Sequence, residues 1–141
     1  MKISIGADHR GLSLKTNIME HLDEHEWLDV GTYTEQRTHY PIFAKRVCQD
    51  IIDGVAQCGI LICASGIGMS VAANRCKGIY AALCWNVEVA RLAKEDDGTN
   101  VLVLPSDFVS AETALSIIDV WLHAEFKEGV YRRRLEMIDE D

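Results

Sequence analysis

The stretch GILICASGIGMSVAANR, residues 59–75, places a short apolar run directly before a glycine turn and a helical pattern. The run GILIC is apolar throughout, which is typical of a strand buried on both faces of a parallel sheet. The residues that follow the glycines have the composition of a helix. A buried strand, a turn and a helix in this order predict one unit of an α/β fold, with Cys63 at the junction.

The same alternation runs along the whole chain. The expected strands are KISIGA, WLDVG, GILICAS, GIYAALC and TNVLVLP. Single helices between strands favour a five-stranded parallel sheet with right-handed crossovers and helices on both faces, which is a three-layer α/β/α sandwich. At 141 residues, we expect one domain over 1–141. The helices are expected at about residues 11–25, 41–53, 67–75, 86–95, 110–124 and 128–138.

Composition narrows the class of protein. The chain is 48% hydrophobic and 26% charged, as in ordinary soluble domains. Its net charge of −8 argues against nucleic-acid binding, because the only compact basic cluster is Arg132 to Arg134. No apolar run approaches the roughly 20 residues of a membrane span, and no long apolar segment of a secretory signal follows the first residues. We therefore expect a cytoplasmic protein whose five cysteines are reduced thiols.

Ligands of open parallel sheets bind beyond the carboxyl ends of the strands, which directs attention to five loops. The loop SGIG leads into a helix, so backbone N–H groups of residues 66–69 can face an anion or a developing oxyanion. Glycines here equally suit tight packing between strand and helix. The spacing fits neither a dinucleotide fingerprint nor a P-loop, so no nucleotide cofactor is expected. The five loops cover residues 8–10, 32–40, 64–68, 84–86 and 105–107.

Cys63 stands out among the cysteines because it ends a strand beside a helix start, where a thiolate is stabilised. Buried cysteines are more often inert filling of the core, and that reading stays open at this point. Asp8 and His9 end the first strand, so a carboxylate and an imidazole can enter the same crevice, although a solvated turn explains them equally well. His39 can bind a ligand or cap a helix.

Other polar residues have weaker signals. Asp96 and Asp97 precede the last strand, where acidic residues are typical of a polar helix end. An arginine of the cluster 132–134 can bind a phosphate or lie on a solvated face of the last helix. Asn74 and Asn100, at element ends, can orient loops by hydrogen bonds. The remaining histidines show no metal-ligand spacing, so no metal site is expected. They are His21, His25 and His123.

Taken together, four segments resemble the family of ribose 5-phosphate isomerase B and galactose 6-phosphate isomerase. The likeness covers nearly the whole chain in order and spacing. It implies a Rossmann-like domain and an aldose–ketose isomerase that uses neither cofactor nor metal. It also implies a dimer, or a tetramer of dimers, with the active site between subunits. The segments are ADH near the N-terminus, GTYTEQRTHYP, ICASGIGMSVAANR and TNVLVL.

The resemblance assigns roles to residues of this chain. Aldose–ketose isomerisation moves a proton between C1 and C2 of the sugar through an enediolate, and Cys63 matches the family's base. Ser65, Gly66 and Gly68 match the loop that stabilises the oxyanion. Contacts to the sugar and its phosphate fall to Asp8, His9 and Arg134, and the helix at about 128–138 is expected at a subunit interface.

The chain also departs from the family pattern. Asp96, followed by Asp97, stands where the family has a ring-opening histidine and an asparagine. Asp107 and Val130 stand where the family has arginines, so two positive charges are missing where a phosphate should bind. Arg10, Arg132 and Arg133 are candidates to replace them.

Four interpretations accommodate these departures. A homomeric pentose-phosphate isomerase would use Asp96 as the ring-opening acid–base. The segment RTHYPIF resembles the B-type subunit of galactose 6-phosphate isomerase, which needs a sister subunit. A tetrose 4-phosphate substrate would need no ring opener, because it has no free hydroxyl to close a furanose ring. A sugar-phosphate binding protein without catalysis is the remaining class, and the intact ICASGIG segment argues against it.

Overall fold

The computed structural model describes residues 1–140, which form one five-stranded parallel sheet. The strand order is β2-β1-β3-β5-β4, and every neighbouring pair is parallel. The central strand is the one that carries Cys63. Its apolar residues are fully buried, as the pattern predicts. The strands are β1 Lys2–Ala7, β2 Glu26–Asp29, β3 Cys58–Cys63, β4 Ala81–Leu83 and β5 Val101–Pro105.

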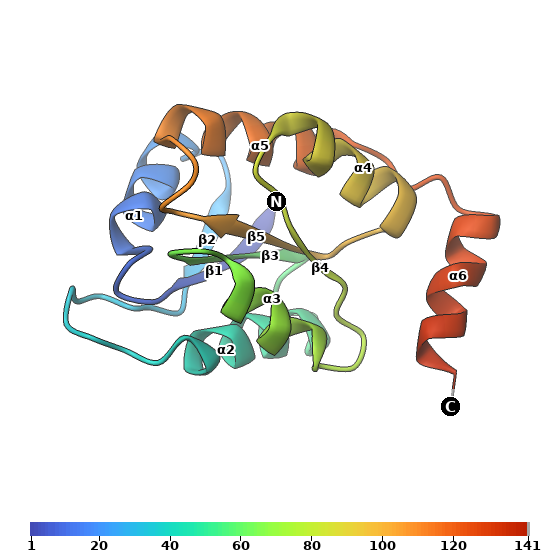
Figure 1. Ribbon diagram of the computed structural model, residues 1–141, viewed down its shortest axis with the longest axis horizontal. Helices are drawn as coiled ribbons and strands as arrows, with labels where there is room; N and C mark the ends of the chain where they lie inside the picture. The colour runs from blue at the N-terminus through green and yellow to red at the C-terminus, as the bar shows by residue number, and fades with distance from the viewer. Residues whose placement is uncertain (141) are drawn as a thin grey trace.

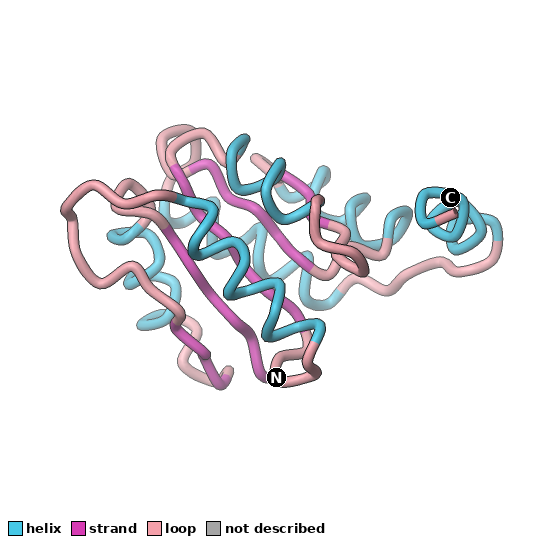
Figure 2. The backbone as a smooth tube through the Cα atoms, turned by 90° about the horizontal axis from the view of Figure 1, so that it is seen from below, coloured by secondary structure: helices cyan, strands magenta, loops and turns pink. Residues whose placement is uncertain are grey.

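Helices cover both faces of the sheet. In Figure 1, α1, α4 and α5 lie on one face and α2 and α3 on the other, which confirms the three-layer sandwich. The last helix, α6, stands beside the sheet rather than over it, and Figure 2 shows the same separation from a second direction. The helices are α1 Leu12–His21, α2 Tyr40–Ile52, α3 Ile67–Asn74, α4 Val87–Asp97, α5 Ala111–His123 and α6 Val130–Asp139.

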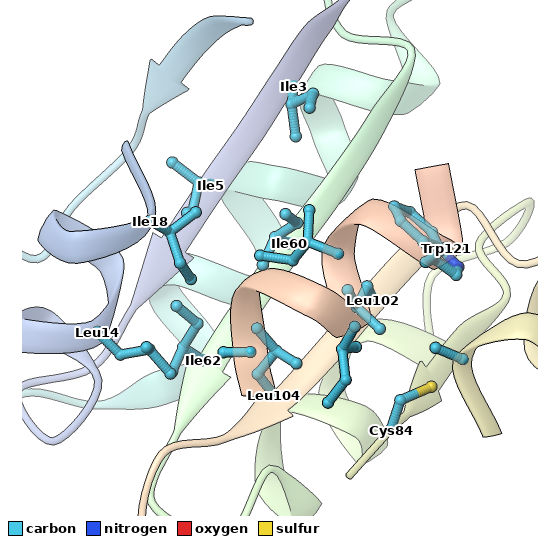
Figure 3. Close-up of a cluster of buried hydrophobic side chains, with 14 of the residues drawn as sticks. Ile3, Ile5, Leu14, Ile18, Ile60, Ile62, Cys84, Leu102, Leu104 and Trp121 are labelled. Atoms are coloured by element: carbon cyan, nitrogen blue, oxygen red, sulfur yellow. The ribbon is translucent and has the colours of Figure 1, made fainter. Parts of the chain in front are cut away.

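Alternate residues of the central strands point into two separate cores. Ile60 and Ile62 join the core under α1, α4 and α5, which Figure 3 shows together with Leu102, Leu104 and Trp121. Leu61 and Cys63, which alternate with them along β3, point into the core under α2 and α3. Burial on both faces explains why the strand is apolar without alternation. The side chain of Cys63 therefore faces the α2 and α3 layer.

The first helix and the fourth strand are the expected elements that extend furthest beyond those of the structure. The first helix ends at His21 rather than near residue 25, because the Leu22 carbonyl accepts a hydrogen bond from the Trp27 indole nitrogen at 2.8 Å. The fourth strand is reduced to three residues, since the Tyr80 amide donates to the Asn100 side chain at 2.9 Å instead of extending the ladder. Side-chain bonds end both elements early.

The two asparagines at element ends hold loops, as the sequence predicts. Asn74 accepts from the Ala81 amide at 2.8 Å and donates to its carbonyl at 3.0 Å. Asn100 binds the Tyr80 amide and the Gly78 carbonyl. Both act at the amino end of the sheet, away from Cys63. Among residues 1–140, every helix is too short or too polar to cross a bilayer.

Candidate active site

Cys63 is the last residue of β3 and is held from its backbone. It pairs with Pro105 in the parallel register, and its carbonyl oxygen accepts hydrogen bonds from the Ser106 amide at 2.9 Å and the Ser106 hydroxyl at 3.2 Å. Its side chain is 5% exposed. The thiol therefore has a fixed position at the carboxyl edge of the sheet, where ligands of parallel sheets bind.

The loop after Cys63 needs its glycines for two different reasons. Gly66 has a φ of +77°, and a Cβ there would lie 2.4 Å from Leu83 Cδ1. Gly68 lies against the ring of Tyr40, whose Cζ would be 2.7 Å from an added Cβ. The glycines thus permit close packing, the more ordinary of the two interpretations of SGIG. They also let the backbone approach a ligand closely.

Helix α3 begins directly after this turn, and the amides of its first turn have no intrahelical acceptor. One of them, Ile67 N, donates to the Ser65 hydroxyl oxygen at 3.2 Å. The remaining amides of residues 66–69 stand at the positive end of the helix. Cys63 and a set of backbone donors are therefore neighbours, which is the arrangement that an oxyanion intermediate requires.

Asp8 and His9 follow β1 at the same edge, as predicted. The Asp8 amide donates to the Ile62 carbonyl at 3.2 Å, which places this loop beside the end of β3. Asp8 Oδ1 accepts from the amides of Arg10 and Gly11 at 3.0 and 3.2 Å. The side chain is buried, so one of its functions is to close the turn that leads into α1.

His9 is held by Thr38 from the loop after β2. The Thr38 amide donates to His9 Nδ1 at 3.2 Å, and the His9 amide donates to Thr38 Oγ1 at 3.1 Å. Because Nδ1 accepts a hydrogen bond, the proton of the neutral ring is on Nε2. His9 therefore presents an N–H donor away from Thr38.

The loop after β5 completes this edge. The Asp107 amide donates to the Ala64 carbonyl at 3.0 Å, so the loop is fixed to the residue after Cys63. The Asp107 carboxylate pairs with the Arg10 guanidinium at 2.6 Å. Arg10, one candidate for a missing positive charge, thus lies at the edge that holds Cys63. Arg132 and Arg133 lie on α6 and pair with acidic residues near the C-terminus.

An apolar groove of about 450 Å³ borders the Cys63 loop. Two of its aromatic side chains, Trp85 and Phe108, are 55% and 75% exposed, which is unusual for such large apolar groups. The hydroxyl of Ser65 is the polar group at its rim. The groove is lined by Ser65, Ile67, Leu83, Trp85, Pro105 and Phe108.

Two predicted site residues lie elsewhere in this chain. Asp96 is in the last turn of α4, just before β5 begins, whereas Cys63 pairs with the end of β5. The five residues of β5 span roughly 13 Å at about 3.3 Å each. The Asp96 carboxylate is engaged by Lys127 Nζ at 2.7 Å. Arg134 is on α6, exposed, with its guanidinium 5.3 Å from the Tyr131 ring centroid.

A crevice of about 530 Å³ lies at this second edge, between α6 and the segment 74–82. It is larger than the groove beside Cys63, yet it contains none of the predicted catalytic groups, and Asp97 and Asp139 are among its lining residues. We therefore choose the carboxyl edge as the candidate active site because of the residues it holds, although the crevice at the other edge is larger. The crevice marks where α6 leaves the body of the domain.

His39 is exposed and precedes α2, where its side chain makes no capping hydrogen bond. His39 therefore occupies the N-cap position of α2 without capping the helix through its side chain, and ligand binding stays a prediction. Within the described residues, no group of three or more histidine, cysteine or acidic side chains is placed to hold a metal ion.

Burial raises the pKa of three other cysteine thiols. Desolvation raises the pKa of Cys84 to about 12 and that of Cys58 to about 11. It also raises the pKa of Cys48 to about 12, with a contribution from the neighbouring thiol of Cys76. These thiols stay protonated at neutral pH. They match the filling role that is usual for buried cysteines.

Sequence reasoning missed three residues that shape the site: Thr38, Tyr40 and Ser106. Thr38 orients His9, Tyr40 packs on Gly68, and Ser106 holds Cys63. Thr38 and Tyr40 belong to the segment RTHYP, so the polar–aromatic run before a helix was the available signal. Ser106 offered no signal beyond its place in the loop after the last strand.

Comparison with known proteins agrees with this arrangement. Residues 3–138 match the family model described as Ribose/Galactose Isomerase. The chain is 41% identical over 139 residues to ribose-5-phosphate isomerase B of Escherichia coli, covering 97% of this chain and 93% of that protein. It is 42% identical over 129 residues to the LacB subunit of galactose-6-phosphate isomerase of Clostridium acetobutylicum, covering 90% and 75%.

The structure is similar to a crystal structure of ribose 5-phosphate isomerase from Thermotoga maritima. The TM-score is 0.97 at 44% sequence identity, and the match covers 99% of this chain and 98% of that one. The family suggested by the four sequence segments is therefore confirmed, and so is the predicted activity class. The chain belongs to the ribose/galactose isomerase family and is an aldose–ketose isomerase.

Proposed function

We propose that this isomerase acts on a sugar phosphate and interconverts ribose 5-phosphate and ribulose 5-phosphate by proton transfer through an enediolate. The observation that carries the proposal is the position of Cys63, a fixed thiol at the carboxyl edge beside the first turn of α3. The similarity to ribose-5-phosphate isomerase B over nearly the full length supports the choice of pentose.

In this proposal the Cys63 thiolate removes the proton from C2 of the aldose and returns it to C1. A positioned base contributes a rate factor of about 10² to 10⁴. The negative charge that develops on the sugar oxygen faces the amides of residues 66–69 and the Ser65 hydroxyl. One such donor is worth about 3 kcal/mol in the transition state.

The loops around Cys63 supply contacts to the rest of the sugar. His9 Nε2–H is a donor to a hydroxyl or to the phosphate, since Thr38 occupies Nδ1. Asp8 uses Oδ1 in its turn, and its second oxygen is the acceptor for a sugar hydroxyl. His39, exposed in the neighbouring loop, is a further candidate contact.

Ribose 5-phosphate is mainly a furanose, so its ring must open before the proton moves. We propose Asp96 as the acid–base for that step. Asp96 is at the amino end of the sheet and Cys63 at the carboxyl end, so both can serve one site only if a second copy supplies Asp96. The same copy would bring Arg134 toward the phosphate.

Two surfaces support a homo-oligomer. The groove with Trp85 and Phe108 exposes large apolar side chains directly beside the Cys63 loop. Helix α6 buries only Leu135, while Val130, Met137 and Ile138 are 57%, 57% and 69% exposed. Apolar surface of this kind is typical of subunit interfaces. We therefore place α6 at an interface between copies.

A second candidate function is a B-type subunit of galactose 6-phosphate isomerase. The 42% identity to such a subunit favours it, as does the aspartate in place of a ring-opening histidine. In that case a sister subunit would supply the missing groups. A tetrose 4-phosphate substrate and a binding protein without catalysis are the remaining interpretations, and they predict different results in the same experiment.

The test is isomerase activity of the purified protein alone against ribose 5-phosphate, allose 6-phosphate, galactose 6-phosphate and erythrose 4-phosphate, with C63A as the blank. We expect turnover of ribose 5-phosphate that vanishes in C63A. Turnover of erythrose 4-phosphate alone would favour the tetrose. Activity only after a sister subunit is added would favour the B-type subunit, and binding without turnover would favour the non-catalytic protein.

A further inference from the structure

The loops after β1 and β5 are joined by an ion pair that has no role in the proton transfer described above. Arg10 Nη2 lies 2.6 Å from Asp107 Oδ2. Beside this pair, the Ser106 hydroxyl lies 3.2 Å from both the Arg10 carbonyl oxygen and the Cys63 carbonyl oxygen. The Arg10 guanidinium is therefore held across the end of β3, next to the residue that carries the proposed base.

This ion pair is accessible and easily exchanged. The Arg10 and Asp107 side chains are 54% and 42% exposed, and water and salt screen pairs of this exposure. The hydrogen bond joins one guanidinium nitrogen to one carboxylate oxygen, which is not the bidentate geometry of the strongest arginine pairs. A phosphate dianion can therefore displace the carboxylate and engage more of the guanidinium donors.

The position also suits the length of the substrate. The phosphate of a pentose 5-phosphate is three carbons away from C2, so it cannot lie at Cys63 itself. Strands β1 and β5 flank β3, and neighbouring strands are about 4.8 Å apart. A groove of about 240 Å³ at this point is lined in part by Arg10, Ser13 and Ser106. The Arg10 guanidinium and the Ser13 hydroxyl can donate hydrogen bonds to phosphate oxygens, whereas the Ser106 hydroxyl proton is engaged by the carbonyl oxygens of Arg10 and Cys63.

We propose that Arg10 binds the substrate phosphate in this groove, and that Asp107 is a positioning residue that holds the guanidinium and competes with phosphate for it. This assignment rests on the proposed function, because it takes the substrate to be a sugar phosphate. The Asp107 carboxylate repels a phosphate and occupies Arg10. Removing its charge therefore strengthens phosphate binding, whereas removing the charge of Arg10 weakens it.

A purely structural role for the pair predicts a different pattern. If the ion pair only fixes the two loops, then either substitution disturbs the loops in the same way. R10M and D107N would then change affinity with the same sign. The opposite signs expected from the proposal make the two cases separable.

The experiment is titration of inorganic phosphate into wild type, R10M, D107N and the double variant by calorimetry, together with KM and kcat for ribose 5-phosphate. We expect R10M to weaken phosphate binding and raise KM by about tenfold, the loss of one charge-assisted contact. D107N should tighten phosphate binding about threefold, with kcat nearly unchanged. The double variant should behave like R10M. K77M, which removes an exposed charge at the other end of the sheet, is the matched control and should behave like wild type.

Phosphate affinity of R10M equal to that of wild type would overturn the proposal, as would weaker binding by D107N or no measurable phosphate binding by wild type. The calorimetric result does not depend on turnover. Binding that needs Arg10 in a protein without isomerase activity would therefore keep the phosphate site and reject the proposed function. An R10M protein that turns over ribose 5-phosphate and binds phosphate normally would reject the phosphate site and keep the proposed function.

Discussion

The two ends of the sheet differ in how completely they are built within one chain. At the carboxyl end, Cys63 is fixed by Ser106, and His9 is fixed by Thr38. At the amino end, the Asp96 carboxylate is engaged by Lys127, and α6 stands apart from the sheet. The groups at the first end are held in place by contacts within one chain. The second end presents groups that have no role in their own chain's site.

This difference follows from the topology. Every strand of a parallel sheet ends at the same edge, so loops from distant parts of the sequence meet there. The residue before β5 is necessarily at the opposite edge. A site that uses both ends must therefore combine two copies, which is the central claim of the proposed mechanism.

The largest expected effect is at the carboxyl end. C63A should reduce kcat by about 10² to 10⁴, because the base itself is lost. C84A is the matched control, since Cys84 is a buried thiol at the same edge whose pKa burial raises to about 12. Both variants should lose a similar amount of stability in urea denaturation, about 1 kcal/mol for a small cavity. Comparable turnover by the two variants would contradict the base assignment.

A second prediction concerns the glycine turn. G66A combines a left-handed backbone with a contact of 2.4 Å to Leu83, so we expect about 2–4 kcal/mol of lost stability. The displaced loop should also lower kcat by about 10². Gly54 has a similar φ of +74° with nothing within 4 Å of an added Cβ. G54A should therefore lose only about 1 kcal/mol and keep full turnover; equal effects would show that Gly66 needs only its φ.

A third prediction tests the amino end. D96N should lower kcat for ribose 5-phosphate about 10-fold to 100-fold and leave an open-chain substrate unaffected, because only ring opening needs the carboxylate. K127M breaks the same ion pair while keeping the carboxylate, so its turnover should stay close to wild type. Steady-state kinetics on a cyclic and an open-chain sugar phosphate distinguish the two. A loss on both substrates would place Asp96 outside ring opening.

The smallest expected effect is at Thr38. T38V removes the oxygen that accepts from the His9 amide at 3.1 Å but keeps the amide that binds Nδ1. We expect KM to rise about fivefold with kcat nearly constant, the cost of a loosened substrate contact. T38S should restore the wild-type KM. T16V, which removes an exposed hydroxyl on α1, should have no effect, and a fall in kcat for T38V would move His9 into the chemical step.

Much of the fold could be predicted because its signals are local. The apolar run of β3 and the glycine turn after it indicate a buried strand followed by a helix start, and the structure has both. The early end of α1 could not be read in the same way. It depends on the Trp27 indole, which binds the Leu22 carbonyl from beyond the helix.

The sequence could predict which loops form the site, but it could not predict which side chains contact one another there. Asp8, His9 and Cys63 follow strands whose ends must meet. The contact between His9 and Thr38 joins residues 29 apart, and the contact between Arg10 and Asp107 joins residues 97 apart. Such pairings depend on loop conformations that composition and spacing do not encode. From the sequence, Asp107 indicates only that a positive charge of the family is missing. The structure adds that its carboxylate pairs with Arg10.

The most direct test of the two-copy site is to mix the C63A and D96N subunits. Each variant alone should turn over ribose 5-phosphate poorly, since every site lacks one group. After unfolding and refolding together in equal amounts, mixed dimers contain one intact site, and random pairing should restore about a quarter of wild-type activity. No recovery in oligomers shown by mass spectrometry to be mixed, or full activity of D96N alone, would contradict a site built from opposite ends of two sheets.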